Sequence, residues 1–567
     1  MTTRQPNISQ FFIQIEGRDL APEVMAQLDD AVVEDDLEQP AMFMLRFNDP
    51  QLKLIDGDLF KLGAEVHLGA ADVSGKGKPV MIGEIVALEP CLEQGNSVLV
   101  VRGYDRLHRL LRGSRIRTFL NRTDDDIVRQ IAREAGLQVE IDSVGAEYPY
   151  VIQHNLTDLA FLRERAARIG YQVRVDGRTL HFRRATARPP QAPALAWGDR
   201  LTSFRVRLAA AAQPGEVQVR GWDPSARRPI LGVARAPSAP PQVNEDQTAG
   251  QVAERTFGNP ATLVVSEHPV ASQGEAERLA QAILDQVGGD YLTAEGECRG
   301  EPALRAGVTI TIGNLGRRLS GTYFVTSTRH TYTPRDGYTT TFFVSGQRPT
   351  GLLAAITPPP AIARFAGVAV GLVTNVSDPE ELGRVRLSFP WLDESHESDW
   401  ARLALPWAGA GRGIFAALDV GDEVLVAFEH GDMARPYVVG CLWNGRDKPP
   451  RAAVAEGRKL ILLHTAGERV ITLDDGGRKL ILTTPEHSIT LDDAARTVEV
   501  MSGSQRVVLD GAGRSVRIES DNTLELSGAG GALRIGPSGV ELSSKATLDV
   551  RANAVLSING SLVKINS

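Results

Sequence analysis

A repeat in the last third of the chain most constrains what it can fold into. Arg478, Arg496 and Arg514 stand eighteen residues apart, and each lies just before a short run in which two apolar residues flank a polar one, as in VEV at 498–500. Alternation of this kind predicts short β-strands with one apolar face, separated by turns. The rhythm continues less regularly to the end of the sequence and predicts about thirteen strands, which at ~4.8 Å per strand give a rod of ~60 Å.

Strands this short cannot close a core by themselves, and their edges would stay unpaired. Two architectures solve both problems: a single-chain β-solenoid, or a three-chain β-prism whose apolar residues meet on a common axis. The prism is favoured because the strands are very short, lack aromatic residues and turn only two small apolar side chains inward. The residues expected in this axial core are Val498, Val500, Val507, Leu509, Val516, Ile518, Leu524 and Leu526.

The part of the chain before residue 350 mixes strands with three helices whose ends are well marked. Helices are predicted within 123–136, 156–170 and 272–289, with Thr123, Thr157 and Ser272 as N-caps. The acidic run 124–126 is interpreted as compensation of the helix dipole and not as a cation site. A mainly β fold with a few helices is therefore expected here.

This first part also contains a faint duplication. Residues 60–69, FKLGAEVHLG, resemble residues 304–313, LRAGVTITIG, with Gly63 aligned to Gly307. Each segment is followed by another glycine-led pair of strands. We infer two similar β-barrels in tandem, with chance resemblance between β-hairpins as the alternative.

Proline-rich stretches at 356–361 and 447–451 isolate a middle segment. Five strands in such a length suit a small closed barrel of the OB type. The strands are predicted at Gly367–Val376, Arg384–Phe389, Trp400–Leu405, Glu423–Phe428 and Tyr437–Leu442.

The same segment holds the strongest candidate for a chemical site: Glu423, Glu429, His430 and Asp432 fall within ten positions. A metal would need three or four converging ligands, and three side chains of one tight loop do not converge without others. The loop is therefore interpreted as a hairpin turn, and no metal, cofactor or catalytic residue is expected. Motifs for nucleotide binding or a nucleophilic serine are also missing.

Bulk properties exclude several classes of function. The net charge of −8 gives no reason to expect binding to nucleic acid or to an anionic membrane. The cysteines, Cys91, Cys298 and Cys441, are few and far apart, which favours a reducing compartment over a disulfide framework. No signal peptide is predicted in the first residues, and no apolar run approaches the length of a membrane span, so any export is expected to use another route.

The middle segment resembles the OB-fold module of the VgrG family and its phage-baseplate relatives. The resemblance lies in LGRVRLSFPWL at 382–392, SDWARLALPWAG at 398–409 and GDEVLVAFEHGD…RPYVVGCLWNG at 421–445. The FPWL version looks most like spike proteins of extracellular, phage-tail-like contractile injection systems. The first part resembles a phage tail hub, and the repeat resembles the family's needle.

This resemblance implies a tail-hub domain with two β-barrels and a helical insert at 1–350, an OB-fold domain at 365–447 and a β-helical needle at 456–567. It implies a homotrimer acting mechanically and not as an enzyme. Its six barrels would seat a three-fold spike on a six-fold tube, with tail-tube and baseplate proteins and cargo effectors as partners. The target membrane would be touched only on firing. Leu562, Val563 and Ile565 of a last strand would form the platform for a PAAR-like tip protein. Assembly in the cytoplasm, as part of a particle that acts outside the cell, is expected.

Other interpretations remain open at this point. Within the class, the chain could be a type VI secretion VgrG protein or a true phage-baseplate spike. From other classes, it could be a receptor-binding fibre or a cell-wall hydrolase. An enzyme domain between barrel and needle, as some relatives carry, is not expected, because only about ten residues separate the barrel from the repeat.

Overall fold

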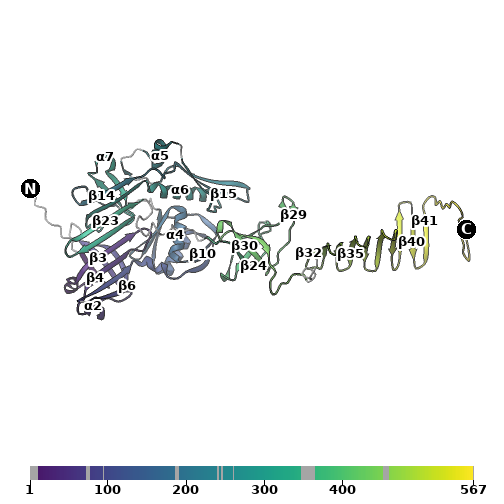
Figure 1. Cartoon of the computed structure of the whole chain (residues 1–567), viewed down its shortest axis with the longest axis horizontal. Coiled ribbons are helices and arrows are strands. Elements are labelled where there is room, and N and C mark those ends of the chain that lie inside the picture. Colours follow the sequence, from purple (N-terminus) through teal and green to yellow (C-terminus); the bar gives the residue numbers. More distant parts are fainter. Residues whose placement is uncertain are drawn as a thin grey trace, which may run out of the picture. The chain divides into compact units, whose positions relative to one another are not determined.

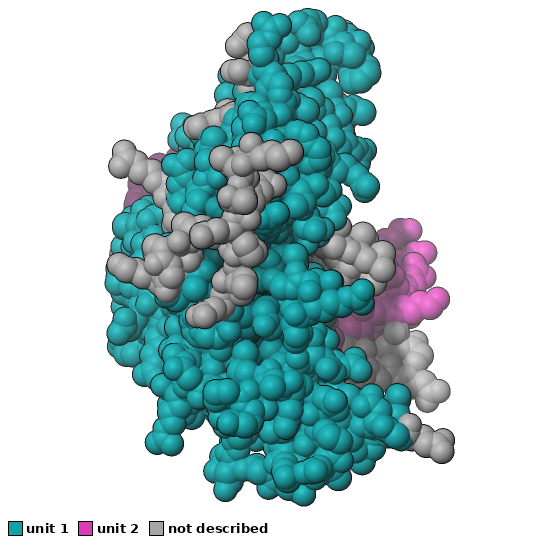
Figure 2. Space-filling view, turned by 90° about the vertical axis from the view of Figure 1, so that its left-hand side faces the viewer, with its two compact units in different colours: residues 1–442 teal, residues 443–567 magenta. Residues whose placement is uncertain are grey.

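The computed structural model describes residues 11–71, 77–93, 95–184, 191–238, 242–243, 247–258, 261–345, 364–450 and 459–565. It forms two compact units, Met1–Leu442 and Trp443–Ser567, coloured separately in Figure 2. The proline-rich stretch 356–361 lies outside the described residues, and so does residue 451 at the end of the second such stretch. The two units are described in turn.

An eleven-stranded sheet organises the first unit. Its strand order is β14-β19-β23-β22-β3-β4-β7-β6-β5-β1-β2, so it joins strands from both halves of the hub. The strands are β1 (Phe11–Ile15), β2 (Arg18–Asp19), β3 (Leu28–Asp36), β4 (Met42–Asn48), β5 (Glu65–Ala71), β6 (Gly77–Glu93), β7 (Asn96–Tyr104), β14 (Leu201–Leu208), β19 (Leu292–Arg299), β22 (Ser327–Thr333) and β23 (Gly337–Ser345).

The duplication predicted from the sequence is present in the strand pairing. Gly63 and Gly307 both have positive φ and precede β5 and β20 (Thr309–Gly313). β5 pairs with β6, and β20 pairs in the same antiparallel manner with β21 (Gly321–Phe324). Each half has its own apolar core, but the pairing of β22 with β3 merges their sheets, which the sequence did not predict.

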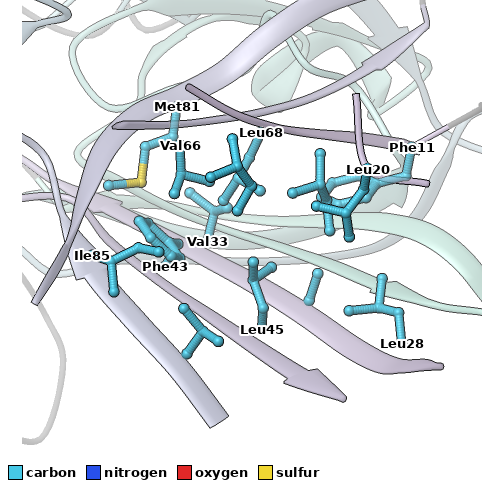
Figure 3. Packing of buried hydrophobic residues seen from close by; sticks show 14 of the residues in the cluster. Phe11, Leu20, Leu28, Val33, Phe43, Leu45, Val66, Leu68, Met81 and Ile85 are labelled. Atoms are coloured by element: carbon cyan, nitrogen blue, oxygen red, sulfur yellow. The ribbon is translucent and has the colours of Figure 1, made fainter. Parts of the chain in front are cut away.

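Alternation of apolar and polar residues explains the core of the first half (Figure 3). Phe43, Leu45 and Phe47 of β4 are fully buried, while the residues between them face outward. Val66 and Leu68 of β5 belong to the same buried cluster. A strand with period two therefore fills one face of the sheet with apolar side chains.

The three predicted helices are confirmed at α3 (Asp124–Glu134), α4 (Asp158–Ile169) and α6 (Gln273–Gly289), with the predicted N-caps. The acidic run at the start of α3 does more than compensate the helix dipole. Asp124 is 1% exposed and accepts a 2.7 Å hydrogen bond from Nε of Arg165 on α4. This buried ion pair ties the two helices together.

The segment from residue 364 forms a six-stranded sheet with the order β26-β25-β24-β30-β31-β27. All five predicted strands are found, three of them shortened and one shifted by one residue, and β26 is additional. Their bounds are β24 (Val368–Asn375), β25 (Arg386–Phe389), β26 (Asp393–Glu397), β27 (Arg402–Leu403), β30 (Glu423–Phe428) and β31 (Pro436–Cys441). Val424, Val426 and Phe428 point into a separate core, as the alternation in β30 requires.

The second unit is a row of short antiparallel strands, seen as β32 to β41 in Figure 1. β32 to β38 form one seven-stranded sheet in sequence order, and β39 to β41 form a three-stranded sheet. The bounds are β32 (Leu460–His464), β33 (Val470–Asp474), β34 (Lys479–Thr483), β35 (His487–Asp492), β36 (Thr497–Ser502), β37 (Gln505–Asp510), β38 (Ser515–Glu519), β39 (Leu524–Gly528), β40 (Gly531–Gly536) and β41 (Gly539–Ser544).

Candidate functional site

Two columns of apolar side chains run along one face of each sheet of the second unit. Cross-strand partners share a face of the sheet, and so do residues two apart on one strand. Val500 pairs with Val507, which pairs with Ile518, while Leu509 pairs with Val516. We call the set the apolar ladder: Ile461, Leu463, Ile471, Leu473, Leu480, Leu482, Ile489, Leu491, Val498, Val500, Val507, Leu509, Val516, Ile518, Leu524, Leu526, Leu533, Ile535, Val540 and Leu542.

The apolar ladder is open to solvent in the single chain. Val516 is 68% exposed, Leu509 46% and Val500 42%, and most other members are at least 36% exposed. Isolated exposed apolar residues are ordinary, but a contiguous apolar stripe of this length marks a contact surface. Covering twenty such side chains would contribute on the order of 20 kcal/mol per chain, at about 1 kcal/mol each for a half-exposed residue.

The described strands of the second unit do not cover this face themselves. Each strand from β32 to β38 pairs with its neighbours in sequence, so the described strands form one layer and do not coil back over it. A single-chain solenoid would instead place a second strand layer against the ladder. The pairing therefore leaves the apolar face to be buried by something other than these strands.

The eighteen-residue spacing has a structural cause in the turns. The carboxylate of Asp492 accepts a 2.8 Å hydrogen bond from the backbone N–H of Ala495, and Asp510 does the same for Gly513 at 2.7 Å. Arg496 and Arg514, which follow, have φ of 55°. A left-handed residue after an aspartate-centred turn reverses the chain at the same point in each unit, so the strands stay in register.

The structure brings together six of the eight predicted core residues. The six from Val498 to Ile518 lie on one face of the seven-stranded sheet, whereas Leu524 and Leu526 belong to the following three-stranded sheet. The sequence analysis missed the ladder members of β32 to β35, β40 and β41. Their strands carry the same alternation of apolar and polar residues, which was the available signal.

The expected last strand at 562–565 is not formed. After β41, the described residues up to 565 contain no strand, and Leu562, Val563 and Ile565 are exposed at 73%, 47% and 78%. The prediction of about thirteen strands is therefore too high for the isolated chain. A strand needs a neighbour for its backbone groups, and no described strand pairs with residues 546–565.

The charged loop after β30 is a turn, as predicted. Glu429 and His430 lie in a one-turn 3-10 helix (Glu429–Gly431), where His430 has a left-handed φ of 50°. The Glu429 carboxylate accepts a 3.2 Å hydrogen bond from Arg435, and that of Asp432 lies 3.6 Å from Arg168. The two carboxylates point to different arginines and do not converge on one point.

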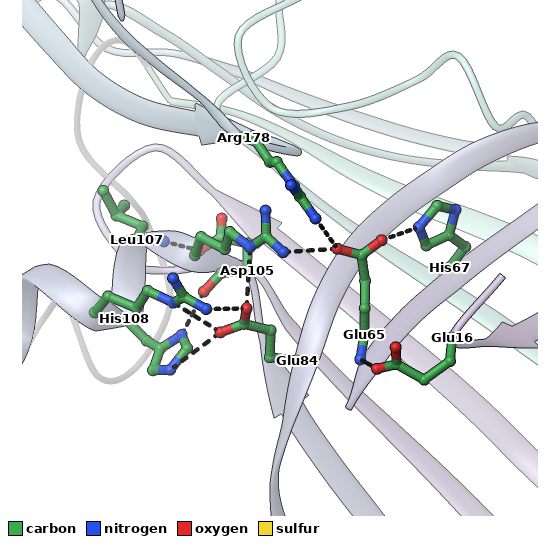
Figure 4. A network of polar contacts seen from close by, with 10 residues as sticks. Glu16, Glu65, His67, Glu84, Asp105, Leu107, His108 and Arg178 are labelled. Carbon is green, nitrogen blue, oxygen red and sulfur yellow. Dashed lines mark hydrogen bonds and ion pairs between the residues drawn. The ribbon is translucent and has the colours of Figure 1, made fainter. Parts of the chain in front are cut away.

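A polar network beside the first core is another place where titratable groups gather (Figure 4). Arg106 bridges the carboxylates of Glu65, at 2.6 Å, and Glu84, at 3.0 Å, and Arg109 also donates to Glu84. Burial alone would raise the pKa of Glu84, but the hydrogen bonds from Arg109 and Arg106 hold it below its ordinary value. Glu84 also lines a cavity of about 780 Å³ with His108 and Arg109. A carboxylate held ionised by two arginines is a structural ion pair, not an acid poised near neutral pH.

Among the described residues, no helix is both long and apolar enough to cross a membrane. Nor do these residues contain a group of three or more His, Cys, Asp or Glu side chains arranged to hold a metal ion.

Two family models match the chain. The model described as the Alg8 N-terminal domain matches residues 10–334, and the type VI secretion system/phage-baseplate injector OB domain matches residues 369–443. The second match covers the six-stranded sheet from β24 to β31. The first covers the hub with its duplicated halves.

Curated proteins with similar sequences are VgrG proteins. The type VI secretion system spike protein VgrG4b of Pseudomonas aeruginosa is 24% identical over 59% of this chain and 45% of its own length. The actin cross-linking toxin VgrG1 of Vibrio cholerae is 32% identical over 15% of this chain and 8% of its own length. The chain thus spans less than half the length of these relatives.

A solved structure of the Francisella PdpA-VgrG complex, half-lidded, resembles this fold. Its TM-score is 0.52 at 10% identity, and the match covers 95% of this chain and 89% of that one. At this identity the resemblance concerns the fold.

Proposed function

We propose a mechanical role for this chain, which belongs to the family described as the Alg8 N-terminal domain and is a VgrG-like spike protein. It is the trimeric spike and hub of a contractile, phage-tail-like injection machine. The hub seats on the tube and baseplate, and the needle stands at the front of the tube as the sheath contracts. The chain carries out no reaction of its own.

The observation that supports this proposal is the apolar ladder. Its face needs a cover, and three copies placed around one axis provide it without any further protein. Each needle strand then has ladder hydrogen bonds along the sheet and a dry contact toward the axis. Unfolding one strand would break both at once, so the assembly resists compression.

In this proposal the chain has three domains: a tail-hub domain at 1–350, an OB-fold domain at 365–447 and a needle at 456–567. Within the needle, the predicted axial residues from Val498 to Leu526 form part of the ladder. The exposed residues Leu562, Val563 and Ile565 form the platform for a PAAR-like tip protein. Binding of that protein would cover these apolar side chains at the end of the needle.

The other partners follow from the role. The hub meets tail-tube and baseplate proteins, cargo effectors travel with the spike, and the target membrane is touched only on firing. Assembly takes place in the cytoplasm, and the particle acts outside the cell that made it. The net charge of −8 supports a role without nucleic acid.

The mass of the purified protein in solution tests this proposal. Size-exclusion chromatography with light scattering should give three copies, a complex of three times 61.2 kDa. A folded, stable single copy would refute the proposal, because the apolar ladder would then need no partner.

The alternatives predict different results. A type VI secretion or phage-baseplate spike would also be a trimer, and neighbouring genes for a membrane complex or a capsid would distinguish them. A receptor-binding fibre would bind cells without the rest of the machine. A cell-wall hydrolase would clear peptidoglycan as a pure protein.

A further inference from the structure

The hub sheet contains the same four-strand motif twice, in the same orientation. The first copy is β3-β4-β7-β6 and the second is β14-β19-β23-β22, with antiparallel pairs throughout. β22 of the second motif pairs with β3 of the first, so the two motifs join tail to head. Figure 1 shows β14, β23, β3, β4 and β6 in this succession.

Irregularities in the pairing align β3 with β14. In β3 the register shifts between Leu28 and Asp30, and in β14 it shifts between Leu201 and Ser203. A β-bulge is a specific local feature, and its presence at the same place in both motifs fixes their correspondence. Leu28 thus corresponds to Leu201, and each later residue of β3 corresponds to the β14 residue 173 positions further along.

Backbone hydrogen bonds align β6 with β22 in the same way. Gly63 N–H donates to the carbonyl of Ile85 at 2.8 Å, and Gly307 N–H donates to the carbonyl of Val325 at 2.9 Å. Ile85 and Val325 return the bond to the residue after the glycine. Ile85 therefore corresponds to Val325, and the far half of β6 corresponds to β22, 240 positions later.

The joint inside the chain shows how two motifs connect. Its six residue pairs run antiparallel from Ser327 opposite Asp36 to Tyr332 opposite Ala31. On the solvent side, the guanidinium of Arg329 lies 3.7 Å from the carboxylate of Glu34, directly across the joint.

The two outer strands of the eight-strand double motif, β14 and β6, each have an open edge. β14 ends the sheet and pairs only with β19 among the described strands. β6 pairs with β5 only up to Glu84, and from Ala87 to Glu93 its described strand partner is β7 alone. An exposed strand edge is a template for pairing with another chain.

We propose that the far half of β6, from Ala87 to Leu92, pairs in antiparallel fashion with β14 of a second copy of this chain. The register is that of the internal joint. It places Leu88 opposite Leu208 and Glu89 opposite Arg207.

The side chains at this register are complementary. Glu89 and Arg207 stand where the internal joint has Arg329 and Glu34, with the charges exchanged. Within its own chain, Glu89 also accepts a 2.9 Å hydrogen bond from Arg102 of β7. On the core side, Leu92, which is 65% exposed in the single chain, lies opposite Phe204. One copy cannot form this pairing within itself, because β6 with Glu89 and β14 with Arg207 lie at opposite ends of the double motif.

The β6 edge also differs from its internal counterpart. Pro90, at the centre of the segment, has no amide N–H, so the ladder between copies has one donor fewer than the ladder of the internal joint. A proline on an edge strand narrows the choice of strands that can pair with it.

Contacts of this type are heterologous, and repeating them closes a ring when the rotation per copy permits. The inference rests on the proposed function in one respect: three copies supply three such joints, alternating with three internal joints. It adds which two edges of the hub meet.

A disulfide tests the register. Cys91 is native and exposed, and the proposed pairing puts it opposite Arg205 of the second copy. Antiparallel partners have Cα atoms close enough for a disulfide. In a Cys441→Ser background, Arg205→Cys should give covalent multimers on a non-reducing gel after mild oxidation, and adding Cys91→Ser should abolish them. Arg46→Cys, a half-exposed arginine on the central strand β4, should give none.

The native mass of the same samples distinguishes a failure of the edge pairing from a failure of the proposed spike function. If the protein has three copies and Arg205→Cys forms no link to Cys91, the edge pairing is wrong and the spike proposal stands. If the protein is a folded single copy, both are wrong.

Charge exchange gives an independent measurement. Glu89→Arg should weaken association of copies about threefold, the size typical of an exposed ion pair, and Arg207→Glu should restore it in the double variant. An additive double variant, without rescue, would overturn the register even if the copies associate.

Discussion

Placing a carboxylate in the apolar ladder tests whether this face is buried in the assembled protein. Val516 is the clearest position, because it is 68% exposed in the single chain and pairs with Leu509 at the end of the seven-stranded sheet. If three copies meet on a common axis, Val516→Asp places three carboxylates there, without cationic partners on the same face.

The magnitude follows from two contributions. Covering two-thirds of a valine side chain stabilises by about 1 kcal/mol, which is lost. A buried carboxyl has its pKa raised by about three units, and keeping it neutral at pH 7 then costs about 4 kcal/mol. Together these make about 5 kcal/mol per chain and on the order of 15 kcal/mol for three chains.

The pH dependence identifies the cause. The new carboxyl has a higher pKa in the assembly than in the separated chain. Assembly is therefore least affected below the separated-chain pKa of about 4, and the destabilisation grows as the pH rises above it. We expect the variant to dissociate at pH 7 in detergent that leaves the parent protein intact, and to recover near pH 4.

Val508→Asp is the matched control. Val508 lies on the neighbouring strand but on the opposite face of the sheet, where it pairs with Glu499 and Arg517. The same valine-to-aspartate change should cost little there, because the face is polar. If light scattering shows that Val516→Asp assembles as firmly as Val508→Asp at pH 7, the ladder does not face a shared dry axis.

Two further predictions concern the first unit. The Asp378 carboxylate accepts backbone hydrogen bonds from Glu380, Leu382 and Arg384 and pairs with the Arg384 guanidinium at 2.7 Å, so Asp378→Asn should lower the free energy of unfolding by about 2 kcal/mol in urea titrations at pH 7. An unchanged midpoint would contradict this network. Burial lowers the pKa of His330 to about 3, so this group destabilises the fold as the pH falls below about 6.5. Between pH 7 and pH 5 the parent should lose about 2 kcal/mol more than His330→Gln, and equal losses in both proteins would show that His330 is not buried neutral.

The sequence predicted local structure wherever one strand or helix carried its own signal. Alternation placed Val424, Val426 and Phe428 on the buried side of β30, and Thr123 and Thr157 marked helix starts through their side-chain caps. The alignment of Gly63 with Gly307 also holds, because both positions need a positive φ before a strand. These features depend on a few neighbouring residues.

What the sequence did not predict depends on distant residues. The joint of β22 with β3 brings together strands about 300 residues apart, and the sequence of neither strand identifies its partner. The aspartate run at 124–126 was assigned a role at the helix end, but only the fold shows that Asp124 meets Arg165 in the interior. The strand expected at 562–565 needed a neighbour that the isolated chain does not supply.

The two contacts proposed between copies use different interactions, and this difference has a mechanical consequence. In the hub, backbone hydrogen bonds and the Glu89–Arg207 pair fix one register, since a shift of one residue would turn Leu88 and Leu92 to the wrong face. In the needle, the ladder of Val, Leu and Ile is non-directional and follows area alone. The hub therefore sets how the copies are arranged, and the needle adds most of the free energy that holds them together. A sulfate salt, which screens exposed ion pairs and strengthens apolar burial, should weaken the first contact while leaving the second intact.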